Sequence, residues 1–88
     1  MKAVATVIGK DKVGIIAKVS TYFAENGINI LDISQTIMQD MFCMIMLVKF
    51  SEDAKLDRIT EELNKLGEEM GVSIHMQREE LFESMHRI

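Results

Sequence analysis

Two kinds of apolar periodicity alternate along the 88 residues of this chain, and their order leaves few folds open. Short β-branched or alternating runs are typical of strands, whereas apolar residues at three- and four-residue steps predict helices. The order is strand, helix, strand, strand, helix, strand, and then a short C-terminal helix. We expect strands at 3–8, 28–37, 42–50 and 72–77, and helices at 15–25, at 51–70 and from 79 onward. Ser51, Glu52 and Asp53 would cap and charge the start of the second helix. Asn26 with Gly27 and Gly71 would end the two long helices, and Gln39 with Asp40 would make the turn between the second and third strands.

This order predicts the α+β class, as a ferredoxin-like βαββαβ two-layer sandwich with an extra C-terminal helix. Two right-handed crossovers with a hairpin between them place the first and third strands in the centre of the sheet. Each long helix has one apolar stripe to bury, so both helices are expected on the same sheet face. Residues 1–78 would form one domain, and 79–88 a helix that packs on the sheet or on a partner protomer.

The expected third strand is apolar on both faces. Residues 42–48 read Phe-Cys-Met-Ile-Met-Leu-Val, with no polar residue at either parity. A strand of this kind is normally buried on both sides, yet two helices on one face can cover only one side. We therefore expect the other face to be covered by a second protomer or by the C-terminal helix. The apolar stripe of that helix is Leu81, Phe82, Met85 and Ile88.

Composition and charge narrow the class of protein. The chain is 48% hydrophobic and 27% charged and has no proline, which is normal for one globular domain. Residues 1–50 carry five lysines against four acidic residues, and 51–88 carry five basic against ten acidic residues. Neither half offers the dense basic face that nucleic acid requires. We expect no signal peptide and no membrane span, and the single Cys43 fits a reducing cytoplasm.

The loop between the first strand and the first helix is the best candidate for a binding site. Its glycine spacing over 9–14 invites a phosphate-loop interpretation, but Ile15 and Ile16 stand where that motif needs Lys and Ser/Thr. A helix N-terminus attracts a carboxylate, Gly14 would let a ligand approach the backbone amides, and Asp11 could accept an ammonium group. The pattern therefore suits a zwitterion such as an amino acid. The alternative is that Asp11 only caps the helix and Gly14 only makes the turn.

The stretch VIGKDKVGIIAKVSTYFAENGINILDISQT resembles the opening half of an ACT domain, a module that typically binds amino acids and regulates other proteins. The resemblance rests on Asp-x-x-Gly-Ile before the helix and on Gly-Ile-Asn-Ile at the start of the second strand. The βαββαβ order extends it to about residue 77. Within the family, the chain is most similar to small stand-alone proteins that resemble the glycine-cleavage regulator.

This resemblance implies a ligand site between two domains that lie side by side through the second strand. One chain would contribute its first loop and the neighbouring chain would contribute Asn29. Two positions depart from common family patterns: Val13 stands where many members have proline, and Gly9 where some have a polar side chain. The implied ligand-binding residues are Asp11, Lys12, Val13, Gly14 and Ile15, with Asn29 from the partner.

Metal binding is a weaker interpretation. Met44 and Met46, close to Met41 and Cys43, could suit a soft metal, but copper chaperones of this fold carry Cys-x-x-Cys in the first loop. Methionine is also a common filler of irregular cores, and that role is favoured here. His75 and His86 lack a second ligand at metal spacing, so we expect both to be solvated and no cofactor to be bound.

We expect no catalysis. An acylphosphatase-like enzyme of the same fold would need an arginine in the first loop, where this chain has lysines, and an RNA-binding sheet would need exposed aromatic residues. The function we expect is a non-catalytic, cytoplasmic, homodimeric regulatory domain that binds an amino acid or similar small zwitterion. A regulated protein partner is possible under this view. The alternative is a ligand-free interaction module that dimerises through its sheet, with an acidic second helix against a target protein.

Overall fold

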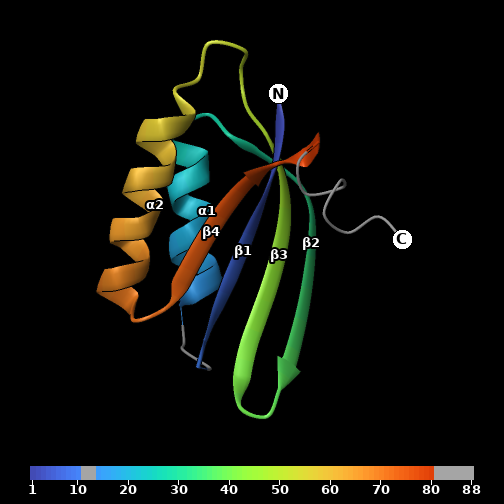
Figure 1. Cartoon of the computed structure of the whole chain (residues 1–88), viewed down its shortest axis with the longest axis vertical. Coiled ribbons are helices and arrows are strands. Elements are labelled where there is room, and N and C mark those ends of the chain that lie inside the picture. The colour runs from blue at the N-terminus through green and yellow to red at the C-terminus, as the bar shows by residue number, and fades with distance from the viewer. Residues whose placement is uncertain (11–13, 81–88) are drawn as a thin grey trace.

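The computed structural model describes residues 1–10 and 14–80 of the chain. Figure 1 shows the predicted order of strands and helices. The predictions for Asp11, Lys12 and Val13, and for the C-terminal helix beyond Glu80, concern residues outside the described part of the chain. The elements are β1 (Lys2–Lys10), α1 (Ile15–Glu25), β2 (Asn29–Met38), β3 (Met41–Lys49), α2 (Leu56–Met70) and β4 (Ser73–Arg78).

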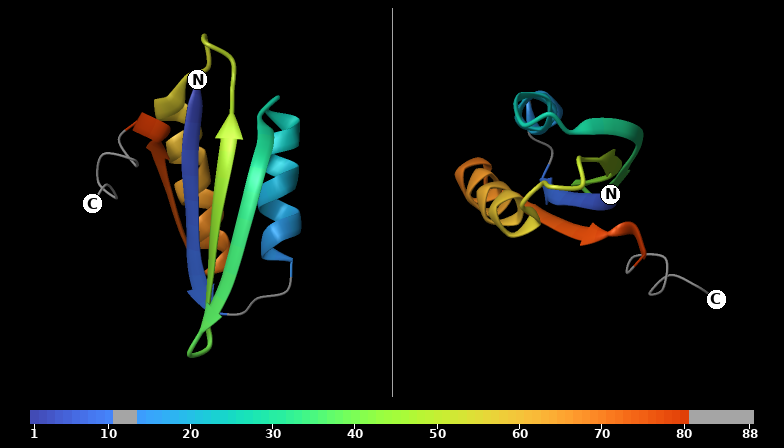
Figure 2. Two further views of the ribbon diagram at one scale, coloured as in Figure 1. Left: turned by 90° about the vertical axis from the view of Figure 1, so that its right-hand side faces the viewer. Right: turned by 90° about the horizontal axis from the view of Figure 1, so that it is seen from above.

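The ferredoxin-like α+β sandwich is confirmed. The four strands form one sheet in the order β2-β3-β1-β4, with every neighbouring pair antiparallel. β1 and β3 are therefore central, as predicted, and β2 and β4 form the edges. Both helices lie on one face of the sheet, which the view from above in Figure 2 makes clear.

The core lies between the sheet and the two helices. Successive side chains of a strand point to opposite faces, and in β1 and β3 every second residue points toward the helices. Gly27 and Gly71, both in the left-handed region, follow the ends of α1 and α2 as predicted. The largest fully buried side chains are Phe23, Met44, Met46, Leu63, Val7, Val19 and Val48.

The second helix starts later than expected. Ser51, Glu52 and Asp53 were predicted to cap it, but α2 begins at Leu56 and its N-cap residue is Lys55. Phe50 is buried, and the backbone N–H of Ala54 donates to the carbonyl of Ser51 over 3.1 Å. The chain therefore makes a separate turn after Phe50 before the helix begins.

The β2–β3 hairpin has two irregular features. Gln39 and Asp40 form the predicted turn, and both have positive φ, as the tight turns that match strand twist require. Farther along β2, the register with β3 shifts between Ile30 and Asp32, so Leu31 is an extra, bulged residue. Beyond this bulge, alternate β2 residues from Ile33 onward share the helix-facing side.

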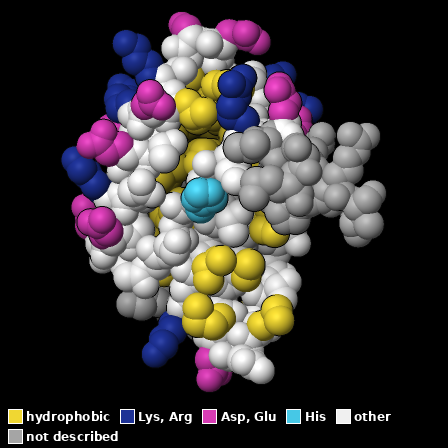
Figure 3. Space-filling model, in the orientation of Figure 1, with side chains coloured by type: hydrophobic (Ala, Val, Ile, Leu, Met, Phe, Trp, Pro, Cys, Tyr) yellow, Lys and Arg dark blue, Asp and Glu magenta, His cyan; other side chains and the backbone are white. Residues whose placement is uncertain are grey.

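Neither α1 nor α2 covers the opposite sheet face, which is the surface that faces the viewer in Figure 3. Apolar side chains are gathered on it (Figure 3), and the exposed fractions of Ile8, Met41 and Ile45 are 42%, 40% and 38%. Val4 points to the same face, because Ala3 and Ala5 on either side of it belong to the helix-side core. Val4 is nevertheless only 5% exposed. We call this surface the open sheet face.

Candidate functional site

A groove lies between the N-terminus of α1 and the edge strand β2. Its volume is about 530 Å³, which falls within the usual range for small-molecule sites, roughly 300 to 1,000 Å³. Ile15 and Phe42 are buried at its base, whereas Ile16 and Ile37 are exposed at its sides. We call it the α1–β2 groove. Its described lining residues are Gly14, Ile15, Ile16, Ala17, Gln35, Ile37 and Phe42.

The end of α1 that opens into the groove can attract a negative charge. The N-cap residue Gly14 has no side chain to bond the first-turn N–H groups, and the first turn of α1 contains no acidic residue. The carbonyl of Gly14 accepts the N–H of Lys18 at 3.0 Å, which leaves the N–H groups before Lys18 without intrahelical acceptors. Together with the helix dipole, these groups favour a carboxylate at this end.

The backbone conformation explains the glycine at position 14. Gly14 has φ 90°, a value that residues with a side chain rarely adopt. An added Cβ would meet no atom within 4 Å among the described residues, so the requirement is conformational and not steric. The same open space leaves the backbone accessible to a ligand.

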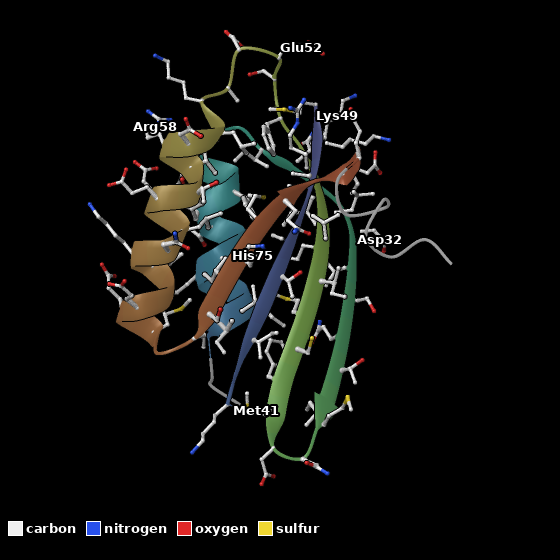
Figure 4. The ribbon with its side chains drawn as sticks, viewed as in Figure 1. Asp32, Met41, Lys49, Glu52, Arg58 and His75 are labelled. Atoms are coloured by element: carbon white, nitrogen blue, oxygen red, sulfur yellow. The ribbon has the colours of Figure 1, made fainter. Side chains whose placement is uncertain are left out.

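The predicted site residues do not all meet within one chain. Gly14 and Ile15 line the groove, as expected, whereas Asn29 pairs with Lys49 at the opposite end of β2. Figure 4 shows this separation, since the labelled Lys49 and Met41 mark the two ends of β3. Asn29 and Ile37 are eight residues apart on the strand, or roughly 25 Å at about 3.3 Å per residue.

Five residues of the groove were not predicted from the sequence. Ile16 and Ala17 directly follow the predicted Ile15 on α1. Gln35, Ile37 and Phe42 reach it from β2 and β3. Phe42 could have been assigned to the helix side from the alternation of β3. Gln35 and Ile37 could not, because the bulge at Leu31 changes which β2 residues face the helices, and no glycine or proline marks it in the sequence.

The end of β1 that leads to the groove has no room for a larger residue. A Cβ on Gly9 would lie 2.5 Å from Cγ1 and 2.9 Å from Cβ of Val72. Real Cβ atoms essentially never approach other atoms this closely. The polar side chain that some family members have at this position therefore has no place here.

A second groove, of about 330 Å³, lies between α1 and α2. At this helix interface the hydroxyl of Tyr22 donates a hydrogen bond to Oε1 of Glu62 over 2.6 Å. Burial, and then this hydrogen bond, raise the pKa of Tyr22 well above its ordinary value. The bond ties the outer surface of α1 to α2.

Met44 and Met46 fill the core, as favoured from the sequence, whereas Met41 is 40% exposed and does not. Met44 and Met46 have no exposed surface and point toward the helices, whereas Cys43 between them points to the open sheet face. Within residues 1–10 and 14–80, no three His, Cys, Asp or Glu side chains gather in a way that could hold a metal ion. His75 lies exposed on β4, as predicted (Figure 4). None of the helices in this part of the chain is long and apolar enough to span a bilayer.

The fold and the groove define a small βαββαβ domain with a candidate small-molecule site next to its edge strand β2, and comparison with known proteins specifies its family. The family model described as ACT domain matches residues 2–77. A UPF0237 protein of Clostridium acetobutylicum is 57% identical over 89 residues, which cover 100% of both chains. The chain therefore belongs to the ACT domain family, whose members are commonly regulatory ligand-binding domains.

Solved structures agree with this assignment. An ACT domain protein from Streptococcus pneumoniae has a TM-score of 0.86 and 42% identity, over 98% of each chain. A candidate glycine cleavage system transcriptional repressor has a TM-score of 0.77 and 27% identity, over 88% of this chain and 44% of that one. The ligand-free regulatory subunit of aspartate kinase from Thermus thermophilus has a TM-score of 0.67 and 30% identity, over 86% and 50%.

Proposed function

We propose that this chain is a non-catalytic regulatory domain of the cytoplasm, which binds an amino acid or similar zwitterion between two protomers paired through β2. Asp11, Lys12, Val13, Gly14 and Ile15 of one protomer and Asn29 of its partner would contact the ligand. Ligand binding would favour the dimer, or one partner-binding form of it, because the ligand has higher affinity for that state.

The position of Asn29 is the observation that carries this proposal. Gly14 and Asn29 lie next to opposite ends of the same edge strand. If two β2 strands pair antiparallel about a two-fold axis near Ile33, the end of the partner's β2 that carries Asn29 comes beside the end that carries Ile37 and borders the groove. The pairing therefore forms two equivalent sites, each with contributions from both chains.

The β2 edge suits such pairing. It is ten residues long, with no proline and no lysine, which are common protections of free edges. Its exposed apolar residues include Leu31, Ile33 and Ile37, at 46%, 38% and 64%. The other edge, β4, is only six residues long and begins with the polar alternation of Ser73 and His75.

The pairing is tested by light scattering after size-exclusion chromatography of Ile33→Lys. Two lysines would then meet near the two-fold axis, and we expect the dimer dissociation constant to rise at least about tenfold. Ile45→Lys is a matched control, because Ile45 is also 38% exposed but lies on the open sheet face of β3. Pairing through β2 is wrong if Ile33→Lys stays dimeric, or if only Ile45→Lys dissociates.

Ligand binding is tested by thermal-shift measurements against the common amino acids. We expect at least one to stabilise the wild type, and Asp11→Ala and Asn29→Ala each to weaken that effect. If no amino acid stabilises the protein, the alternative function is favoured: an interaction module that presents the acidic surface of α2 to a target. Asp57, Glu61, Glu68 and Glu69 are exposed on that helix.

We also propose which part of the chain covers the open sheet face. Arg78, the last residue of β4, pairs with Ala3, next to the buried Val4. The chain thus leaves the sheet beside the part of this face that is already protected from solvent. We propose that residues 79–88 pack over Val4 and the half-buried Leu47 of the same chain, as the apolar stripe of that segment allows.

A further inference from the structure

We infer that the α1–β2 groove selects an amino acid with an apolar side chain of about leucine or methionine size, in preference to glycine, alanine or serine. This inference rests on the proposed function, namely that the groove binds an amino acid. It adds the chemical class of the ligand side chain, which follows from the residues that line the groove.

The lining offers an apolar surface and almost no polar side chains. Ile15 and Phe42, 2% and 7% exposed, form the base, and Ile16 and Ile37 stand at the sides. Among the described lining residues, none carries a charge, and Gln35 is the one with a polar side chain. This described part of the lining can therefore bury an apolar ligand side chain.

Ile37 shows that the groove is incompletely filled. Its Cα partner in β3 is Phe42, so Ile37 points to the helix side of the sheet, yet 64% of it is exposed. Across the groove, Ile16 on α1 is 36% exposed. These two isoleucines border the same space, so an alkyl group placed between them removes apolar surface from water on both sides.

The polar end of an amino acid matches the remaining surface. The first-turn N–H groups of α1 adjoin the groove and suit the carboxylate common to all amino acids. Discrimination must therefore come from the side chain. Each buried methylene is worth about a fourfold change in affinity. Leucine has three more side-chain carbons than alanine, and full burial of all three would multiply the fourfold change three times. Because the groove is open, burial is incomplete, and we expect a difference in affinity of roughly tenfold.

The inference is tested by calorimetric titration of the full chain with glycine, alanine, serine, aspartate, lysine, valine, leucine and methionine. We expect leucine or methionine to bind about tenfold more tightly than alanine, and more tightly than glycine or serine. Ile16→Gln should weaken leucine binding by about tenfold and leave the affinity for alanine nearly unchanged. Ile45→Gln is the matched control, because Ile45 is also an exposed isoleucine, at 38%, but lies on the open sheet face.

The possible outcomes separate the inference from the proposed function. Tight binding of glycine, serine or a charged amino acid, with leucine equal or weaker, overturns the side-chain selectivity and keeps the amino-acid function. Equal loss of leucine affinity in Ile16→Gln and Ile45→Gln overturns the assignment to this groove. If no amino acid binds at about 10 mM, a concentration above millimolar dissociation constants, both the side-chain selectivity and the amino-acid-binding function are wrong.

Discussion

Gly67→Ala is expected to destabilise the protein, although alanine is the better helix former. At an exposed position inside a helix, this change would stabilise by about 1 kcal/mol. Gly67 is buried on α2, however, and a Cβ there would lie 2.7 Å from the carbonyl oxygen of Val72 and 3.3 Å from Cγ1 of Ile74. The helix backbone passes directly over the chain that enters β4.

The magnitude follows from how little this contact can relax. Ordinary contact begins at 3.4 Å, so α2 and the Val72 carbonyl must separate by about 0.7 Å, the difference between 3.4 and 2.7 Å. Val72 is also held close to the helix at this same residue, because its N–H donates to the carbonyl of Gly67 over 2.9 Å. Overpacking of this kind costs about 1 to 3 kcal/mol. Against the helix-propensity gain of about 1 kcal/mol, we expect a net loss of about 1 kcal/mol.

A loss of this size is easily measured in a domain of this length. It corresponds to a decrease in Tm of roughly 4 to 8 °C, followed by circular dichroism and checked by urea denaturation. Asn64→Ala is the matched control, because Asn64 is exposed on the same helix and should gain stability from helix propensity alone. A Tm of Gly67→Ala equal to or above that of the wild type would refute the close contact between α2 and the Val72 carbonyl.

Two further predictions concern alkaline pH and the C-terminus. The pKa of Tyr22 is raised by folding, so its protonated form contributes stability that is present below about pH 10 and is lost as the pH rises above it. Tyr22→Phe should therefore show a shallower alkaline loss of stability than the wild type in urea titrations from pH 8 to pH 11; identical slopes would contradict this. Truncation after Glu80 should expose Val4, lower the Tm by about 5 °C or more and increase binding of a hydrophobic dye; unchanged values would show that residues 81–88 do not cover the open sheet face.

The sequence was sufficient to predict the fold because the residues that end its helices and turn its hairpin are easily recognised. Asn26 with Gly27 ends the first helix, Gly71 ends the second, and Gln39 with Asp40 turns the hairpin, each where the sequence predicted it. The order of the elements then left one sheet arrangement. The late start of α2 was missed because burial of Phe50 and the turn to Ala54 depend on packing against other elements.

The groove could be predicted only in part. Gly14 and Ile15 come from a local loop–helix signal, which is readable from neighbouring residues. Gln35 and Ile37 depend on the register of β2, which the bulge at Leu31 changes without a sequence mark.

Val72 also restricts how relatives of this chain could acquire a different ligand site. It is packed against Gly9 at the end of β1, while its carbonyl lies under α2. Any mutation that places a side chain at position 9 meets Val72 first, so the residue at 72 must become smaller before or together with that change. A polar side chain at position 9, next to the first loop, therefore requires a smaller residue at position 72. We expect the residues at positions 9 and 72 to vary together among homologues.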